Sequence, residues 1–129
     1  MHKTILSISL ASTLMLVAVS FAAAQNQNYS GVITANQIAA TGGSSSLGLW
    51  MKKLNCHGER DCAQMLVRAG GKYVLVTAKG VYPLSDQNKA ALFAGARVTV
   101  AGTYDRSKKT IEVADVQAYN ASATSAGLQ

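Results

Sequence analysis

Residues 72–119, KYVLVTAKGVYPLSDQNKAALFAGARVTVAGTYDRSKKTIEVADVQAY, carry most of the folding signal in this chain. Residues 72–77 are rich in β-branched side chains, and a three-residue connection that ends in Gly80 leads into residues 81–84. This pattern predicts a β-hairpin. Pro83 cannot donate a hydrogen bond to a strand ladder, so the second strand lies at an edge or ends there.

The second half of the same stretch predicts a helix followed by another hairpin. Ser85 or Asp86 can cap a helix that ends at Gly95. Residues 97–104 then alternate between apolar and polar side chains, as a half-buried strand does. A polar turn follows, and residues 110–119 form the return strand.

Two details of this hairpin indicate strong curvature. Val116 falls out of phase with Ile111 and Val113, which predicts a β-bulge near Asp115. Gly102 stands where a strand of a small barrel has to bend sharply.

The region before this stretch has weaker patterns. Residues 29–35 predict a first strand, and Asp61 can cap a short helix over residues 62–69. Residues 41–46 are rich in Gly and Ser and predict a flexible surface loop. Residues 47–54 fit either a strand edge or a loop.

The predicted order is therefore strand, excursion with a helix, strand, strand, helix, strand and strand. A helix between the third and fourth of five strands is the arrangement of an OB-type barrel. We expect a mainly β fold over residues 29–119, a small five-stranded OB-like barrel with one or two short helices.

Residues 61–117 resemble a family of small exported bacterial proteins of unknown function. A helix that carries Cys62 leads into a Gly-Lys-Tyr-Val-Leu-Val strand, and later come a helix ending in Phe-Ala-Gly, a Val-x-Val-x-Gly-Thr strand and an Ile-x-Val strand. The end of this stretch is also similar to the periplasmic bacterial OB-fold group. The motifs imply an architecture and no activity. Leu66 stands where members of the first family often carry a further Cys, which puts any role of that thiol in doubt here.

The N-terminus has the three-part pattern of a secretory signal peptide. A basic start at Lys3 is followed by an almost wholly apolar run over residues 5–21 and by three alanines ending at Ala24. A retained membrane anchor is the alternative, but no basic cluster follows the apolar run. We expect residues 1–24 to be removed on export to the periplasm or the medium, and no transmembrane segment to remain.

Two polar segments flank the predicted domain. Residues 25–28 form a polar lead-in, and residues 120–129 are small and polar, which is typical of a disordered tail. Loss of the leader changes the formal charge from +6 to +5 because Lys3 leaves with it.

Cys56 and Cys62 predict a disulfide, because an oxidising compartment favours one. The alternative is a thiol-based site for a copper-like metal, or a redox pair, in which His57 joins the two sulfurs together with Met51 or Met65. The spacing is neither Cys-x-x-Cys nor a haem-attachment motif, so we expect no metal and no cofactor.

Acid–base and nucleophilic chemistry has few candidates. His57 is the single His beyond the leader, and no Gly-x-Ser-x-Gly motif occurs. We therefore expect no catalytic residues and no enzyme activity.

A basic, tyrosine-rich surface remains as the candidate binding site. OB-type barrels often bind nucleic acids or sugars on one face, where aromatic rings stack. We expect a monomer that binds an anionic or oligomeric envelope component or an envelope protein, and no nucleic acid, because that ligand is scarce outside the cytosol. A purely structural accessory module is a further possibility. The predicted face comprises Lys72, Tyr73, Tyr82, Arg97 and Tyr104.

Overall fold

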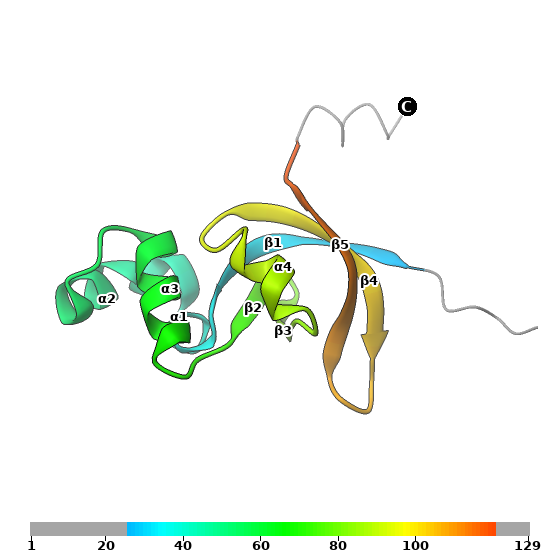
Figure 1. The fold of residues 1–129 in the computed structure, drawn as a ribbon, viewed down its shortest axis with the longest axis horizontal. Helices are drawn as coiled ribbons and strands as arrows, with labels where there is room; N and C mark the ends of the chain where they lie inside the picture. Colours follow the sequence, from blue (N-terminus) through cyan, green and yellow to red (C-terminus); the bar gives the residue numbers. More distant parts are fainter. Residues whose placement is uncertain (1–25, 121–129) are drawn as a thin grey trace, which may run out of the picture.

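A five-stranded antiparallel sheet forms the centre of the computed structural model, which describes residues 26–120 (Figure 1). The order across the sheet is β3-β2-β1-β4-β5. The predicted signal peptide and nearly all of the predicted tail lie outside the described residues. The strands are β1 (Gln27–Ala35), β2 (Tyr73–Thr77), β3 (Gly80–Pro83), β4 (Arg97–Asp105) and β5 (Thr110–Ala118).

Short helices occupy the connections between strands. None of the helices within residues 26–120 has the length and apolar character needed to cross a membrane. Figure 1 shows α1, α2 and α3 gathered beyond one end of the sheet, with α4 against the strands. They are α1 (Asn36–Ala40), the 3₁₀ turn η1 (Gly43–Ser46), α2 (Leu47–Leu54), α3 (Glu59–Arg68) and α4 (Gln87–Ala91).

Strand β1 is shared between two partners. Its first part, from Gln27 to Val32, pairs with β4, and its last residues, from Val32 to Ala35, pair with β2. Gly31 lies next to the point where β1 stops pairing with β4 and begins to pair with β2. A Cβ atom on Gly31 would collide with the carbonyl oxygen of Val76. Glycine therefore lets β2 pass close to β1 where the sheet changes direction.

The β-bulge predicted near Asp115 is confirmed. Ala101 lies opposite Asp115 and Gly102 lies opposite Val113, so Ala114 is the extra residue of β5. This insertion lets both Ile111 and Val116 point into the core. A Cβ on Gly102 would collide with the backbone of β5, which explains why the bend needs glycine.

The mainly β class is confirmed, but the closed barrel is not. Strands β3 and β5 are the two edges of the sheet, and a single parallel bridge between Leu84 and Ile111 joins them. The Ser85 N–H donates to the Ile111 carbonyl at 3.0 Å, and the Ser85 hydroxyl accepts from the Val113 N–H at 2.9 Å. A longer ladder does not form, because β3 is short and Pro83 has no N–H to donate.

Helix α4 holds the two sides of the sheet together. The Asp86 carboxylate accepts from the Lys89 N–H at 2.9 Å and caps the helix, as predicted. The Gln87 amide accepts from the Tyr73 N–H at 2.7 Å and donates to its carbonyl at 3.0 Å. The Lys89 ammonium donates to the carbonyl of Ala114, at the bulge, at 2.9 Å. The helix thereby connects β2 to β5.

The core lies between the inner face of the sheet and the helices. The strands and α1 contribute the largest fully buried side chains, and α3 and α4 contribute several small ones, which lets them approach the strands closely. The strand members include Ile33, Leu75, Val98, Val100 and Ile111, and the helix members include Ile38, Cys62, Ala63, Leu66 and Ala90.

Residues 47–54 form a helix, not the strand edge or loop predicted from the sequence. Leu47, Trp50 and Leu54 recur at helical spacing and pack against the core. The helix ends at Asn55, which has a left-handed backbone with φ of 54°. The Gly/Ser-rich segment 41–46 before it contains η1, in which Gly43 and Ser46 are buried.

Helix α3 begins earlier than predicted. Asp61 is not its cap but lies in its first turn, where the carboxylate accepts from the backbone N–H of His57 at 2.8 Å. A carboxylate in this position also interacts favourably with the helix dipole.

Candidate functional site

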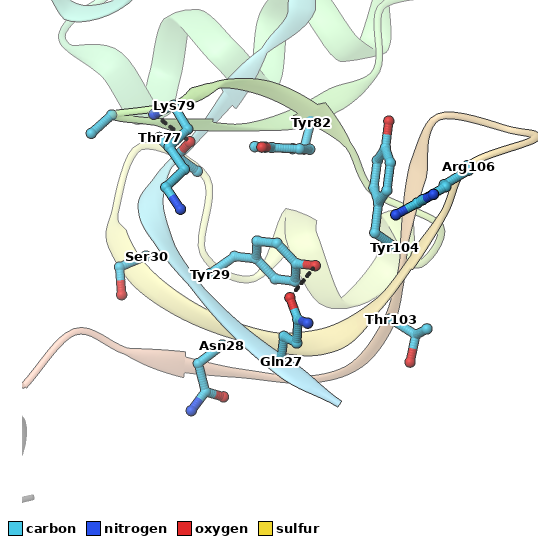
Figure 2. A pocket seen from close by; sticks show the side chains of 11 residues that line it. Gln27, Asn28, Tyr29, Ser30, Thr77, Lys79, Tyr82, Thr103, Tyr104 and Arg106 are labelled. Atoms are coloured by element: carbon cyan, nitrogen blue, oxygen red, sulfur yellow. Dashed lines mark hydrogen bonds between the residues drawn. The ribbon is translucent and has the colours of Figure 1, made fainter. Parts of the chain in front are cut away.

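A cavity of about 730 Å³ opens at the end of the sheet opposite α1, α2 and α3 (Figure 2). It lies between the first half of β1, the β2–β3 turn and the β4–β5 turn. Figure 2 shows Asn28, Ser30 and Thr103 pointing away from the cavity. The lining residues are Gln27, Asn28, Tyr29, Ser30, Thr77, Ala78, Lys79, Tyr82, Thr103, Tyr104 and Arg106.

Three tyrosines reach this cavity because they continue the inner face of the sheet. Tyr82 pairs across the strands with Leu75, and Tyr104 pairs with Ile111. Both partners are fully buried core residues, and side chains directly opposite each other point to the same face. Tyr29 likewise pairs with a buried valine of β4.

The three rings form a continuous aromatic cluster. The Tyr82 ring centroid lies 5.7 Å from that of Tyr29, with the planes tilted by 50°. It also lies 5.7 Å from that of Tyr104, in an edge-to-face arrangement at 86°. The Tyr29 hydroxyl donates to Gln27 Oε1 at 3.3 Å. Within residues 26–120, the hydroxyls of Tyr82 and Tyr104 have no hydrogen-bond partner, so both can bond to a ligand.

The charge of the lining is entirely positive. Lys79 comes from the β2–β3 turn and Arg106 from the β4–β5 turn, and none of the lining residues is acidic. The neighbouring Asp105 is engaged elsewhere, because its carboxylate accepts from the Ser107 hydroxyl at 2.7 Å and from the Lys108 N–H at 3.2 Å. These hydrogen bonds lower the pKa of Asp105.

The structure brings together only part of the predicted binding face. Tyr82 and Tyr104 line the cavity, whereas Lys72 precedes β2, and Tyr73 and Arg97 are the first residues of β2 and β4. Tyr73 is buried, and the Lys72 N–H donates to a side chain of α1.

Arg97 has a separate aromatic partner. Its guanidinium lies 4.6 Å from the ring centroid of Tyr119, near the end of the described chain. The five predicted residues therefore do not form one continuous face.

The binding face predicted from the sequence omitted Tyr29, Lys79 and Arg106. Tyr29 belongs to a predicted strand, but its neighbours depend on the register with β4, which no local pattern reveals. Lys79 and Arg106 each follow the end of a hairpin strand, and both predicted turns fall at the same end of the sheet. A comparison of the two predicted hairpin turns would therefore have placed Lys79 and Arg106 near each other.

The cysteine pair lies outside this cavity, and it links the segment after α2 to the first turn of α3. Cys56 and Cys62 are joined as a disulfide with Cα atoms 5.1 Å apart, and both side chains are buried. With the sulfurs bonded to each other, neither is available as a thiolate ligand beside His57. Residues 26–120 hold no cluster of three His, Cys, Asp or Glu side chains able to bind a metal.

Comparison with known proteins gives one finding of similarity. Residues 65–119 match the family described as "Protein of unknown function (DUF5818)". No curated protein and no solved structure matches the chain. The matched segment runs from within α3 to the residue after β5, so it includes both turns of the cavity but not β1. Over that segment, the chain is similar to a family of uncharacterised proteins, which agrees with the resemblance expected from the sequence in this coarse form.

Proposed function

We propose that this protein is an exported, non-enzymatic binding domain that holds an acidic oligosaccharide of the cell envelope in its tyrosine cavity. One observation supports this most directly. Three clustered tyrosine rings share a cavity with two cations and no carboxylate.

The chemistry of the lining suits a charged sugar. Aromatic rings offer flat apolar surfaces to the faces of sugar rings, and their hydroxyls can bond to the sugar's own hydroxyls. Lys79 and Arg106 lie on two different turns, so they can contact carboxylates on neighbouring sugar units. The volume of about 730 Å³ is within the ordinary range for a small-ligand site.

Two further features support export and an OB-like architecture. A disulfide-bonded small domain fits an oxidising compartment, as does the leader pattern of the sequence. Helix α4 lies between β3 and β4, and the Leu84–Ile111 bridge joins the two edges of the sheet at one point. Both features would be present in an OB-type barrel that closes only at that point. Barrels of this type commonly bind sugars on an open face.

Calorimetric titration with galacturonate oligosaccharides tests the proposal, because the fully methyl-esterified oligomers provide a neutral control with the same rings. We expect the acidic form to bind at least tenfold more tightly at low salt and to lose affinity as salt rises. Equal binding of the two forms would contradict the charge requirement. Failure of galacturonate, glucuronate and alginate oligomers alike, or tighter binding of a short oligothymidine, would contradict the proposed ligand class.

A matched pair of lysine variants tests the location. Lys79→Gln removes a cation from the cavity, and Lys72→Gln removes another exposed cation, just before the start of β2. We expect the first variant to weaken binding about fivefold and the second to leave it within twofold, since screening limits the reach of surface charges to about 10 Å. Equal losses would show that the ligand does not use this cavity.

A further inference from the structure

Helix α2 carries an apolar side chain on its outer surface. Leu47, Trp50 and Leu54 face the core, but Leu49 is out of phase with them and is 73% exposed. Met51, at the margin of the core-facing stripe, is 38% exposed. Figure 1 shows α2 at the tip of the molecule, beyond α3 and away from the open end of the sheet.

The surroundings of Leu49 are basic and aromatic. Lys52 and Lys53 follow it at helical spacings of three and four residues, so the three side chains share one surface. The Lys53 ammonium lies 5.2 Å from the centroid of the Trp50 ring. α2 has no acidic residue, and the single ion pair found within residues 26–120 joins Lys108 to Glu112.

Trp50 is held at the border between core and solvent. Its indole N–H donates to the Thr41 hydroxyl at 2.8 Å, and its ring lines a shallow hollow of about 260 Å³ beside Leu49 and Lys53. The Cys56–Cys62 disulfide joins the segment after α2 to the first turn of α3, which restrains the helix at the tip. The outer surface of α2 is thus presented on a fixed support.

We propose that α2 docks this protein onto an anionic lipid surface, with Leu49 inserted among the lipid chains and Lys52 and Lys53 against the headgroup phosphates. Apolar side chains beside lysines, with a tryptophan at the boundary, suit the interface of a bilayer. Each lysine near an anionic leaflet adds to the attraction.

The small size of the surface favours a membrane over a protein partner. A stable protein interface covers about 800 Å² on each side. α2 has only eight residues, and its outer surface ends at charged side chains. A fluid lipid surface can accept a small protrusion without a matching shape, whereas a folded partner needs a broad complementary face.

The single tryptophan of the chain lies in this surface and serves as the reporter. We expect mixed phosphatidylglycerol–phosphatidylcholine vesicles to shift the Trp50 emission to shorter wavelength and to sediment with the protein, and pure phosphatidylcholine vesicles to do neither. Leu49→Ser should weaken vesicle binding about fivefold. Leu92→Ser removes a leucine that is 70% exposed elsewhere and should leave binding within twofold.

Charge variants separate docking from general attraction. Lys52→Gln with Lys53→Gln should abolish the emission shift, whereas Lys108→Gln with Lys109→Gln, an equal loss of charge at the β4–β5 turn, should retain it. Equal losses in the two pairs, no binding of wild type to the mixed vesicles, or full binding by Leu49→Ser would each overturn the proposal. Lys79→Gln should bind vesicles normally, so this result is independent of the sugar-binding proposal.

Discussion

The buried core and the open cavity use the same face of the sheet on neighbouring strands. Leu75 and Ile111 are fully buried, while their direct cross-strand partners, Tyr82 and Tyr104, border a cavity, and Tyr104 is 36% exposed. Helix α4 packs against β2 and β5, the strands that carry the first pair. Tyrosine suits the uncovered position, because its ring can pack against the core while its hydroxyl reaches solvent or a ligand. Whether an inward-facing residue becomes core or binding surface therefore depends on what covers it.

The largest expected effect is on the free energy of unfolding, and it compares the cross-strand partners Leu75 and Tyr82. Leu75→Ala should lower the free energy of unfolding by about 3 kcal/mol, because the truncation leaves a cavity in a fully packed core. Tyr82→Ala should cost only about 1 kcal/mol, because its side chain is partly exposed and its loss leaves no enclosed void. Urea denaturation of both variants measures the difference. An equal cost would mean that the open end is as much core as the covered end.

Removal of the disulfide tests whether the two ends are independent. Cys56→Ser together with Cys62→Ser should destabilise the fold by about 2 kcal/mol, as expected for a short closed loop. Thermal unfolding measures the loss. Sugar affinity of the folded variant should stay within twofold of wild type, because no element of α2 or α3 lines the cavity. A large loss of affinity would show that the helical end positions the site.

The features predictable from the sequence are those with local causes. The bulge near Asp115 follows from the phase of three apolar residues, and the cap at Asp86 follows from residue type. The helix over residues 47–54 was also readable, since its core-facing side chains have helical spacing. Leu49 and the paired lysines obscured that spacing, and they are the residues now placed on the outer surface of the helix.

The site depends on pairings that are not local. Tyr29 and Tyr82 are far apart in sequence, and they lie on β1 and β3, which β2 separates in the sheet, so their contact depends on how the whole sheet curves. A register shift of one residue would turn Tyr29 to the opposite face. The predicted face grouped cations with tyrosines by composition, and it therefore mixed Tyr82 and Tyr104, which line the cavity, with Lys72 and Arg97, which do not.

The smallest expected effect is on the pH dependence of folding stability. One carboxyl at the helical end and one at the open end should change this dependence in opposite directions. At the helical end, burial raises the pKa of Glu59, an effect that the hydroxyl of Ser44 partly offsets. A carboxyl whose pKa is higher in the folded protein favours folding in acid, and this contribution is lost as pH rises through the folded pKa. Glu59→Gln should therefore be more stable than wild type at neutral pH, by less than about 0.5 kcal/mol because the group is partly exposed.

Asp105, at the open end, should behave in the opposite way. Hydrogen bonds from the Ser107 hydroxyl and the Lys108 backbone lower its pKa, so its ionised form favours the fold above the unfolded pKa. Asp105→Asn should be less stable than wild type at neutral pH, and the difference should vanish as pH falls through the folded pKa. Urea midpoints from pH 3 to pH 7 measure both variants. Two variants that shift in the same direction would show that the carboxyls at the two ends do not differ as the structure indicates.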